Sequence, residues 1–435
     1  MKRYLAFIVF LAWFAGIAAA RNLSSEVQDS SRLTLNAAIA AYDYQRAIAI
    51  ADTLISDLTD TLDKSRKREL VSVKVFCLKK LMRFDEAIAE LMKVMDRNVP
   101  DPALMAEVAD CHLMNRDYAK AMDMYYMLTV LSPSNSYFRM QLAYMMYYNG
   151  LYQDCIASCK NLLAGSASLP VLNLMADSYN MSGEKDSAIL YYGKYLELSP
   201  SSPKVVEKLS GILLGRKQYD EVISLTGDYL QGNPDDMIVN PLYGLALHLK
   251  GEYGKSADVF EKQLELGDES YPTYFYLGLN RLMLKDNEAA EMAFGKAYEA
   301  DSTNVEGMYH YANTRNMRFK SRDSLSMALF RKAIDLSMPD STMMYNFRYG
   351  YATSLLKAGD LQEAISSYRE AYSLYPADIS CLSYIGYCYE QMEDWDNALR
   401  YYEMYLKRGK EGTEMYRFVQ GSVKYIKGEL FMKAE

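Results

Sequence analysis

Histidine is scarce in this chain of 435 residues, and common catalytic motifs are missing. Only His112, His248 and His310 occur, and none lies at metal-ligand spacing from a cysteine or a paired carboxylate. The sequence contains no G-x-x-x-x-G-K-[ST], no G-x-G-x-x-G and no G-x-S-x-G segment, so it has no phosphate-binding loop or nucleophile elbow of these kinds. We therefore expect no enzyme, no catalytic residues, no metal site and no cofactor.

Long apolar runs are missing except at the N-terminus. Lys2 and Arg3 precede an apolar run that ends at Ile17 and is followed by three alanines up to Ala20. This order is typical of a secretory signal peptide. It predicts cleavage after Ala20 and a periplasmic or extracellular mature chain without a membrane span. The alternative is an uncleaved anchor, because about 17 apolar residues lie at the lower edge of what spans a bilayer.

A surplus of basic residues is also missing. The chain has 48 Lys and Arg against 56 Asp and Glu, and residues 1–20 contain two of the basic residues and none of the acidic ones. The mature chain is therefore more acidic than the whole. Binding to phosphate backbones needs a basic surface, so we expect no nucleic-acid partner.

The sequence does contain a repeat, which is clearest between Leu169 and Asp236. Apolar or small residues recur at positions 4, 7, 8, 11, 20, 24 and 27 of each copy, and a proline follows at position 32. Each member of one copy has its counterpart 34 residues later: Leu172, Met175, Ala176, Tyr179, Ala188, Tyr192, Tyr195 and Pro200, then Val206, Leu209, Ser210, Leu213, Val222, Thr226, Tyr229 and Pro234. The first four positions share one helix face and the next three share another. A fixed period of this length predicts stacked helical hairpins.

A short turn separates the two predicted helices of each copy. Gly183 lies in one turn and Gly215 in the next, and we expect glycine to leave the helix there with a positive φ. Small residues such as Ala176 and Ala188 let the two helices approach closely.

The pattern resembles the tetratricopeptide repeat (TPR), which favours a bulky residue at position 4, Leu at 7, a small residue at 8, Tyr at 11, Ala at 20, an aromatic at 24, Ala at 27 and Pro at 32. The matching residues are Leu172, Ala176, Tyr179, Ala188, Tyr192 and Pro200. Tyr195 and Tyr229 depart from it at position 27, which predicts wider helix spacing. The resemblance implies an all-α, right-handed superhelical solenoid that binds extended peptides on its concave side.

The pattern divides the chain into three parts: a signal peptide at 1–20, about eleven TPR-like repeats over 21–412, and a C-terminal capping helix within 413–435. The expected repeats start near residues 28, 68, 102, 136, 169, 203, 237, 271, 305, 345 and 379. The ninth copy is irregular, with two extra residues between its helices in the basic segment Arg315–Arg322 and about four more around Pro339. We expect a looser turn and a kink there.

Six cysteines lie in the mature chain: Cys77, Cys111, Cys155, Cys159, Cys381 and Cys388. Cys77 and Cys111 occupy the same position in adjacent copies, on helices roughly 8–10 Å apart. Cys381 and Cys388 are two helical turns, about 10 Å, apart. A disulfide needs Cα atoms within about 7 Å, and Cys155 and Cys159 fit small buried apolar positions. We predict six free thiols.

First-helix positions 2, 5, 9, 12 and 13 are left free by this packing and are expected to line the concave groove without packing contacts in the monomer. Tyrosine offers large contact area at low entropy cost, and asparagine can pair with a peptide backbone. The candidate partner-binding residues are Tyr137, Met140, Tyr144, Tyr147, Tyr148, Asn173, Asp177, Asn180, Phe275, Tyr309, Asn313 and Asn316.

These features together predict an exported scaffold or adaptor for protein–protein interaction, which binds a partner protein or extended peptide in the concave groove. The alternative is an envelope-associated glycan-binding component that uses the same tyrosine-rich groove.

Overall fold

The computed structural model describes residues 30–58, 64–96, 99–164, 168–319, 321–336 and 341–433. The predicted signal peptide lies outside these ranges. Within them all regular secondary structure is helical, which confirms the all-α prediction. No helix in these ranges combines the length and apolar character needed to cross a membrane. The chain divides into two compact units, residues 1–200 (unit 1) and residues 201–435 (unit 2).

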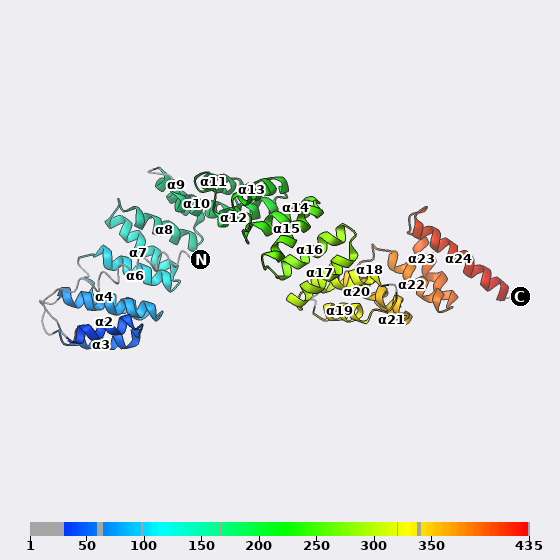
Figure 1. Ribbon diagram of the computed structural model, residues 1–435, viewed down its shortest axis with the longest axis horizontal. Coiled ribbons are helices and arrows are strands. Elements are labelled where there is room, and N and C mark those ends of the chain that lie inside the picture. The colour runs from blue at the N-terminus through cyan, green and yellow to red at the C-terminus, as the bar shows by residue number, and fades with distance from the viewer. Residues whose placement is uncertain are drawn as a thin grey trace. The chain divides into compact units, whose positions relative to one another are not determined.

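The helices follow one another with short connections in both units (Figure 1). Unit 1 contains α2 (Ser30–Ala40), α3 (Tyr44–Ser56), α4 (Lys64–Lys80), α5 (Phe84–Val94), α6 (Pro102–Met114), α7 (Tyr118–Leu131), α8 (Ser136–Tyr148), α9 (Tyr152–Leu163), α10 (Leu169–Met181) and α11 (Lys185–Leu198). Unit 2 contains α12 (Pro203–Gly215), α13 (Tyr219–Gly232), α14 (Val239–Lys250), α15 (Tyr253–Glu265), α16 (Tyr271–Met283), α17 (Asn287–Ala300), α18 (Val305–Arg318), α19 (Ser324–Leu336), α20 (Ser341–Ala358), α21 (Leu361–Leu374), α22 (Ser380–Gln391), α23 (Trp395–Leu406) and α24 (Glu414–Lys433).

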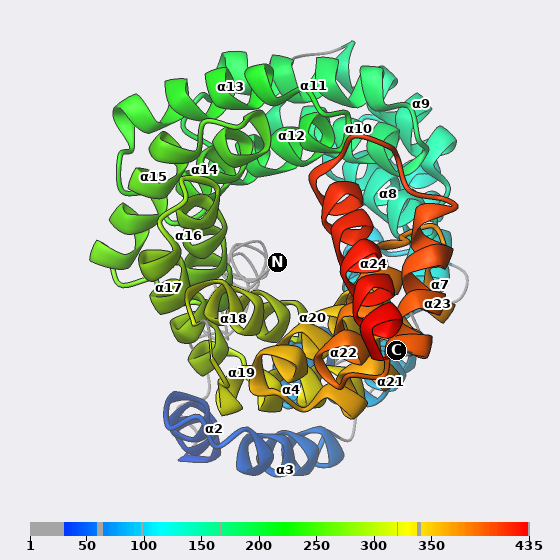
Figure 2. The same ribbon diagram turned by 90° about the vertical axis from the view of Figure 1, so that its right-hand side faces the viewer.

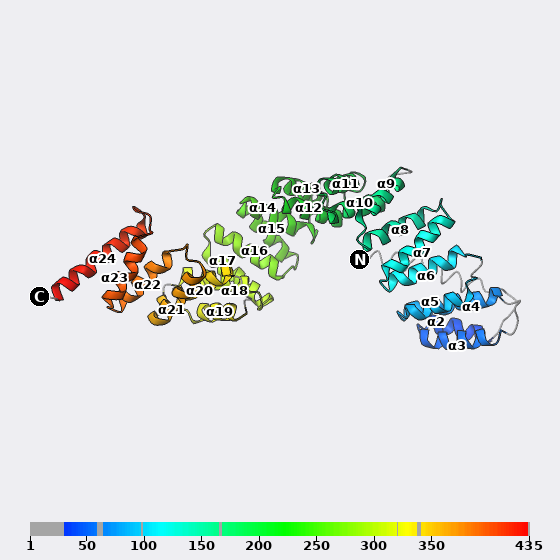
Figure 3. The same cartoon turned by 180° about the vertical axis from the view of Figure 1, so that it is seen from behind.

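Consecutive helices pack as hairpins, and each hairpin packs on the next within its unit. In unit 2, for example, α14 contacts α15, α15 contacts α16 and α16 contacts α17 (Figure 3). The first helices of neighbouring hairpins also touch, as α8 does with α10 and α14 with α16. One hairpin cannot bury both of its faces, so stacking is what completes the core.

The last helix, α24, packs against α23 at the C-terminal end of unit 2 (Figure 2). Val419 and Ile426 on α24 are fully buried, while Phe418 and Tyr425 stay exposed. The helix therefore covers the apolar face that the last hairpin leaves open, as a capping helix does in solenoids.

Small residues where two helices cross make the close packing possible. Ala176 on α10 and Ala188 on α11 are both fully buried, next to the large ring of Tyr192. In unit 2 Gly278 occupies the position equivalent to Ala176, and a Cβ there would lie 2.7 Å from the Phe294 ring. A side chain at this position would force the two helices apart.

The turns inside the hairpins repeat one backbone conformation. A residue with positive φ recurs with the period of the repeat, at Tyr42, Met82, Arg116, Gly150, Gly183, Lys217, Gly251, Lys285, Gly359 and Glu393. After each of them the next backbone N–H bonds the carbonyl five residues earlier, as Glu184 does with Tyr179 at 2.9 Å. This is the Schellman arrangement, which satisfies carbonyls at a helix C-terminus.

The expected glycine is used in only some of these turns. Gly183 has φ of 87° as predicted. The prediction was wrong for Gly215, which is the last residue of α12, because Lys217 takes the left-handed conformation with φ of 60°. The position in the turn decides the conformation, and the hydrogen bonds of the turn offset the steric cost of a side chain there.

The described residues between α18 and α19 do not form this turn. Residues 319–323 separate its helices, two more than the 182–184 turn between α10 and α11. Phe319, which follows α18, has an extended backbone with φ of −95°. The next helix, α20, begins at Ser341, four residues before the expected repeat start near 345. Much of the second insertion is therefore an additional helical turn.

All six cysteines are free and buried, as the sequence predicts. Burial raises the pKa of Cys77 to about 11 and that of Cys388 to about 12. Cys155 accepts a hydrogen bond from the Ser178 hydroxyl at 3.2 Å. The thiols thus act as small core side chains.

Candidate functional site

The predicted groove residues fall into two groups, one in each unit. Eight of them lie on α8 and α10 of unit 1, which pack side by side. The other four lie on α16 and α18 of unit 2. We call the first group the α8–α10 face, made of Tyr137, Met140, Tyr144, Tyr147, Tyr148, Asn173, Asp177 and Asn180.

Helix α8 brings tyrosine and methionine to this face and almost no charge. Asn135 caps the helix by accepting a hydrogen bond from the Tyr137 amide at 3.0 Å. Tyr137 and Tyr148 are 47% and 49% exposed, while Met140, Tyr144 and Tyr147 are half-buried. From Met140 to Gln153 the sequence has no charged residue. The α8 part of the face is therefore aromatic and adaptable rather than ionic.

The α8 tyrosines also contact their neighbours, contrary to the expectation that they pack against nothing. Tyr148 stacks on Tyr118 with ring centroids 4.9 Å apart. Tyr147 meets Tyr152 edge to face at 5.7 Å. Tyr118 begins α7 of the preceding hairpin and Tyr152 begins α9 of the same hairpin, so both rings lie beside the end of α8. The rings are consequently held in place before any partner binds.

Helix α10 contributes polar groups to the same face. The Asn173 amide donates to the Asp177 carboxylate at 3.1 Å. Lys185, at the start of α11, donates to the Asn180 side-chain oxygen at 2.6 Å and to its backbone carbonyl at 2.9 Å. Asn173, Asp177 and Asn180 are half-buried, and Met181 beside them is 54% exposed.

A buried tyrosine beneath the face holds the carboxylate of Asp177. Tyr192 on α11 is fully buried and donates its hydroxyl hydrogen bond to Asp177. The same arrangement occurs two hairpins earlier, where fully buried Tyr125 on α7 donates to Asp110 on α6 at 2.5 Å. In both cases the two residues are 15 apart in sequence. We did not predict these pairs, although a recurring Asp-x14-Tyr spacing in the repeat is the signal that finds them.

The carboxylates change the ionisation of the tyrosines around them. Burial, together with the charge of Asp177, raises the pKa of Tyr147 to about 12. Burial and the charge of Asp110 likewise raise the pKa of Tyr137 to about 12. Burial also raises the pKa of Asp110 itself, against the hydrogen bond from Tyr125 and the nearby Lys79. Both tyrosines lie where an added negative charge is disfavoured.

Two of the four candidates in unit 2 are core residues, which corrects the sequence prediction. Phe275 is 6% exposed and stacks on Tyr271 at 5.2 Å, with the His310 ring at 5.4 Å. Asn316 is also 6% exposed and donates to the Ser354 hydroxyl at 2.7 Å. By counting, Phe275 occupies the repeat position of Met140 and Asn173, and Asn316 occupies that of Asn180, but side chains of the next first helix cover them: His310 of α18 meets Phe275, and Ser354 of α20 meets Asn316.

The other two candidates in unit 2 are half-buried on α18. Tyr309 lies edge to face against Phe330 with centroids 6.1 Å apart, and burial raises its pKa. Asn313 lies one turn further along the helix. Unit 2 therefore offers less of the predicted groove than unit 1 does.

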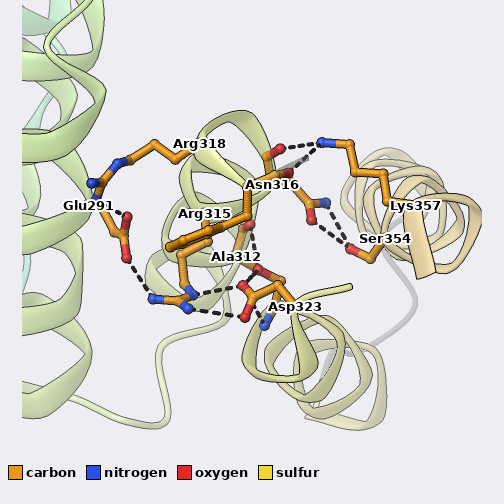
Figure 4. Close-up of polar contacts among 10 residues, drawn as sticks. Glu291, Ala312, Arg315, Asn316, Arg318, Asp323, Ser354 and Lys357 are labelled. Atoms are coloured by element: carbon orange, nitrogen blue, oxygen red, sulfur yellow. Dashed lines mark hydrogen bonds and ion pairs between the residues drawn. The ribbon is translucent and has the colours of Figure 1, made fainter. Parts of the chain in front are cut away.

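The C-terminal end of α18 carries an ionic cluster that the sequence did not predict (Figure 4). Arg315 binds both oxygens of Asp323, at 2.8 and 3.0 Å. It also reaches Glu291 of α17 at 2.6 Å, and Arg318 pairs with the same carboxylate. Glu291 is only 8% exposed. The inserted residues are thus tied to both neighbouring helices.

Helix α20 completes the cluster from the other side. Lys357 donates to the backbone carbonyls of Asn316 and Phe319, which lie at the helix end where carbonyls lack partners. Burial lowers the pKa of Lys357. We define Glu291, Arg315, Arg318, Asp323 and Lys357 as the α18 clamp. The turn is longer than its counterparts, but the expectation of a loose turn was wrong because these contacts fix it.

Among the residues that the structure describes, no three His, Cys, Asp or Glu side chains gather in a way that could hold a metal ion.

Comparison with protein families identifies tetratricopeptide repeats in the chain. A family model described as tetratricopeptide repeat matches residues 328–379 and 349–413, which run from within α19 to beyond α23. The predicted resemblance is confirmed for this part of unit 2. A comparison with curated proteins gives no match.

Solved structures of TPR proteins are similar in fold at low sequence identity. A TPR protein from Parabacteroides merdae is 14% identical, with a TM-score of 0.41, over 57% of this chain and 97% of that one. YrrB, described as a TPR protein with an unusual peptide-binding site, is 15% identical, with a TM-score of 0.37, over 44% of this chain and 95% of that one. Yeast Tom70 is 15% identical, with a TM-score of 0.35, over 86% and 98%.

Proposed function

We propose that this protein is an exported interaction scaffold that binds an extended segment of a partner protein along the α8–α10 face. The observation that carries the proposal is the composition of α8, whose tyrosines, together with Met140 and Met146, remain half-buried or exposed, with no charged residue from Met140 to Gln153. The presence of tetratricopeptide repeats supports the class of function.

The chemistry of the face suits an extended peptide. Tyr137 and Tyr148 offer ring faces that neighbouring side chains already hold in place, so little rotamer entropy is lost on binding. Asn173 and Asn180 add amide groups that pair with a peptide backbone. Aromatic anchors surrounded by adaptable side chains are the composition of binding hot spots.

Photocrosslinking tests where a partner binds. p-Benzoylphenylalanine placed at Tyr144 or Met181 should give the same adduct in cells. As controls, the same group placed at Tyr126 on α7 or Leu190 on α11, which are 60% and 53% exposed on second helices, should give none. Adducts from the control positions alone would place the partner elsewhere and overturn the proposal.

Substitutions then measure the contribution of individual side chains. At least one of Tyr147→Ala, Tyr148→Ala and Asn180→Ala should weaken binding of the crosslinked partner by about 2 kcal/mol. An adduct that glycosidase treatment removes would favour the glycan-binding alternative instead.

Export is the second part of the proposal and rests on residues 1–20. Exported protein should begin at Arg21 when its N-terminus is sequenced. Material that begins at Met1 would contradict cleavage and favour a retained anchor.

A further inference from the structure

We infer that the segment bound on the α8–α10 face is proline-rich and adopts the polyproline II conformation, with prolines three residues apart against the tyrosine rings. This inference rests on the proposed function and specifies the chemistry of its partner. It follows from three features of the face: hydrogen-bond acceptors that are already used, hydroxyl groups that can donate, and tyrosines at a matching spacing.

The acceptor groups of α10 are already bound within the protein. One oxygen of Asp177 accepts from the Tyr192 hydroxyl, and the other accepts from the Asn173 amide at 3.1 Å. The side-chain oxygen of Asn180 accepts from Lys185 at 2.6 Å, and so does its backbone carbonyl at 2.9 Å. A peptide N–H that lost its water on this face would compete for acceptors that already have donors, and leaving such a group unpaired is costly.

Proline avoids this cost. It has no backbone N–H, whereas each residue of an ordinary extended strand brings one. A proline-rich segment also forms polyproline II readily and makes no hydrogen bonds within itself, so its carbonyls stay open to donors. The face therefore selects a segment that is rich in acceptors and poor in donors.

Donors for those carbonyls come from the end of α8. Tyr148 is 49% exposed and Tyr147 is half-buried, and each carries a hydroxyl that can donate. Burial and the charge of Asp177 raise the pKa of Tyr147 to about 12, so this hydroxyl keeps its proton at neutral pH. On α10, Lys185 occupies the side-chain oxygen of Asn180, so the amide nitrogen is the part of that group that can bind a ligand carbonyl.

Helix geometry sets the spacing of the prolines. Tyr137 and Tyr144 lie seven residues apart on α8, which is two turns and about 10.5 Å along the helix. Polyproline II has three residues per turn and rises about 3.1 Å per residue, so residues i and i+3 share one side about 9.3 Å apart. The two spacings differ by about 1 Å. Rigid rings on both partners lose little entropy on contact, and aromatic-lined grooves dock proline-rich segments in this way.

Charge plays little part in this recognition. Helix α8 carries a single charged residue, Arg139, and none follows it in the sequence before Asp154. The partner is therefore recognised by ring contacts and hydrogen bonds, and its affinity should depend only weakly on salt.

Fluorescence anisotropy with labelled peptides tests the inference on the full-length chain. The probes are a 12-residue repeat of Pro-Pro-Ala, its all-D mirror image, which forms the helix of opposite hand, and a 12-residue repeat of Val-Thr-Ala, which favours an extended strand. The Pro-Pro-Ala peptide should bind at least tenfold more tightly than either of the others, with less than a twofold change from low to high salt. Equal affinity of the strand-forming peptide, equal affinity of the mirror image or a tenfold loss in high salt would each overturn the inference.

A pair of double variants locates the contact. Tyr137→Leu with Tyr144→Leu keeps apolar area and removes the ring faces, and it should lower affinity for the Pro-Pro-Ala peptide at least tenfold. The control, Tyr126→Leu with Tyr425→Leu, changes tyrosines that are 60% and 55% exposed on α7 and α24 and should change affinity less than twofold. Equal losses in both would mean unspecific contact with exposed tyrosines and overturn the inference.

Two further results keep the test decisive. If the leucine variant of the face unfolds at the assay temperature, Tyr147→Phe with Tyr148→Phe replaces it, because phenylalanine keeps both rings and removes the hydroxyl donors; affinity should fall at least fivefold, and unchanged affinity overturns the inference. A crosslink from Tyr144 or Met181 to a segment without proline would reject the proline-rich partner and leave the proposed function standing, whereas adducts from the control positions alone would reject both.

Discussion

The hairpin of α10 and α11 and the hairpin of α18 and α19 reach the same arrangement of two packed helices by different physical means. In the first, the backbone closes the turn, with Gly183 in the left-handed region and the Glu184 amide bonded to the Tyr179 carbonyl at 2.9 Å. In the second, the turn has no left-handed residue among its described positions. Side chains of α17, α18 and α20 hold it instead.

The comparison shows how a hairpin accommodates extra residues in its turn. Loop entropy changes little when two residues are added, but a longer turn loses the backbone bonds that satisfy the helix end. In the α18 hairpin Lys357 supplies donors for those carbonyls, and Arg315 on α18 binds both Asp323 in the turn and Glu291 on α17. The α18–α19 hairpin therefore depends on buried ion pairs. We expect single substitutions of these charged residues to destabilise it more than substitutions in the turn of α10 and α11 do.

Removing the shared carboxylate of the clamp should have the largest effect. Glu291→Ala leaves Arg315 and Arg318 without the partner that both contact. Breaking a buried ion pair from one side costs about 3–5 kcal/mol, and chemical denaturation measures it. Glu288→Ala is the control, because Glu288 is 74% exposed and pairs with Arg318 at 3.3 Å; it should cost under about 1 kcal/mol. Equal effects would mean that the cluster is a surface feature.

Core substitutions in the regular hairpin should come next. Leu172→Ala removes a side chain that is 4% exposed and should cost about 2–5 kcal/mol through the cavity it leaves. Ala188→Leu adds volume at a fully buried position and should cost about 1–3 kcal/mol. Thermal unfolding of both variants against the parent checks this. Loss of under about 0.5 kcal/mol in Leu172→Ala would contradict the helix packing.

Acid should weaken the α18 hairpin before the α10 hairpin. Burial raises the pKa of Asp323, but hydrogen bonds from Arg315 and Ser326 outweigh it, and the folded pKa lies below the usual value. Such a carboxylate stabilises the fold above its unfolded pKa of about 3.9, and this contribution is lost as the pH falls further, through the folded pKa. Hydrogen exchange at pH 7 and pH 3 should show residues 312–319 opening more than residues 176–183. In Asp323→Asn the difference between the two pH values should shrink.

Substitutions at the left-handed position of two turns should change the free energy of unfolding by about 1 kcal/mol, in opposite directions. Gly183→Ala places a Cβ on a residue with φ of 87°, where about 1–2 kcal/mol is lost. Lys217→Gly relieves the same strain and should stabilise by about 1 kcal/mol or less. Denaturant titration of the two variants measures both. A stabilising Gly183→Ala would mean that the turn geometry is misassigned.

The smallest effects on stability should come from the α8–α10 face. Asn180→Ala should change the free energy of unfolding by no more than about 0.5 kcal/mol, because the side chain is half-buried and its hydrogen-bond partner Lys185 is exposed. Tyr148→Ala should cost about 0.5–1.5 kcal/mol through its stack on Tyr118. Melting temperatures distinguish the two. If Tyr148→Ala unfolds the protein as Leu172→Ala does, that tyrosine is core and the face is smaller than proposed.

The sequence by itself determined the helices, their pairing and most of the core. Apolar residues that recur at helical spacing lie on one face of the helix, and that face packs in the core. Leu172, Ala176, Ala188 and Tyr192 are buried, as this pattern predicts. The free thiols followed from the same geometry. The sequence also located the insertion between α18 and α19, because a break in a 34-residue period is visible without coordinates.

Only the tertiary structure decided how non-periodic side chains are used. Phe275 and Asn316 hold groove positions by counting but are core residues, since the neighbours that cover them belong to other helices. The Tyr192 to Asp177 bond and the α18 clamp likewise join residues far apart in the sequence. A helical period states which side of its own helix a residue faces, whereas burial and partners depend on the lengths and side chains of adjacent helices. That is why the fold followed from the pattern, and the division between binding face and structural clamp did not.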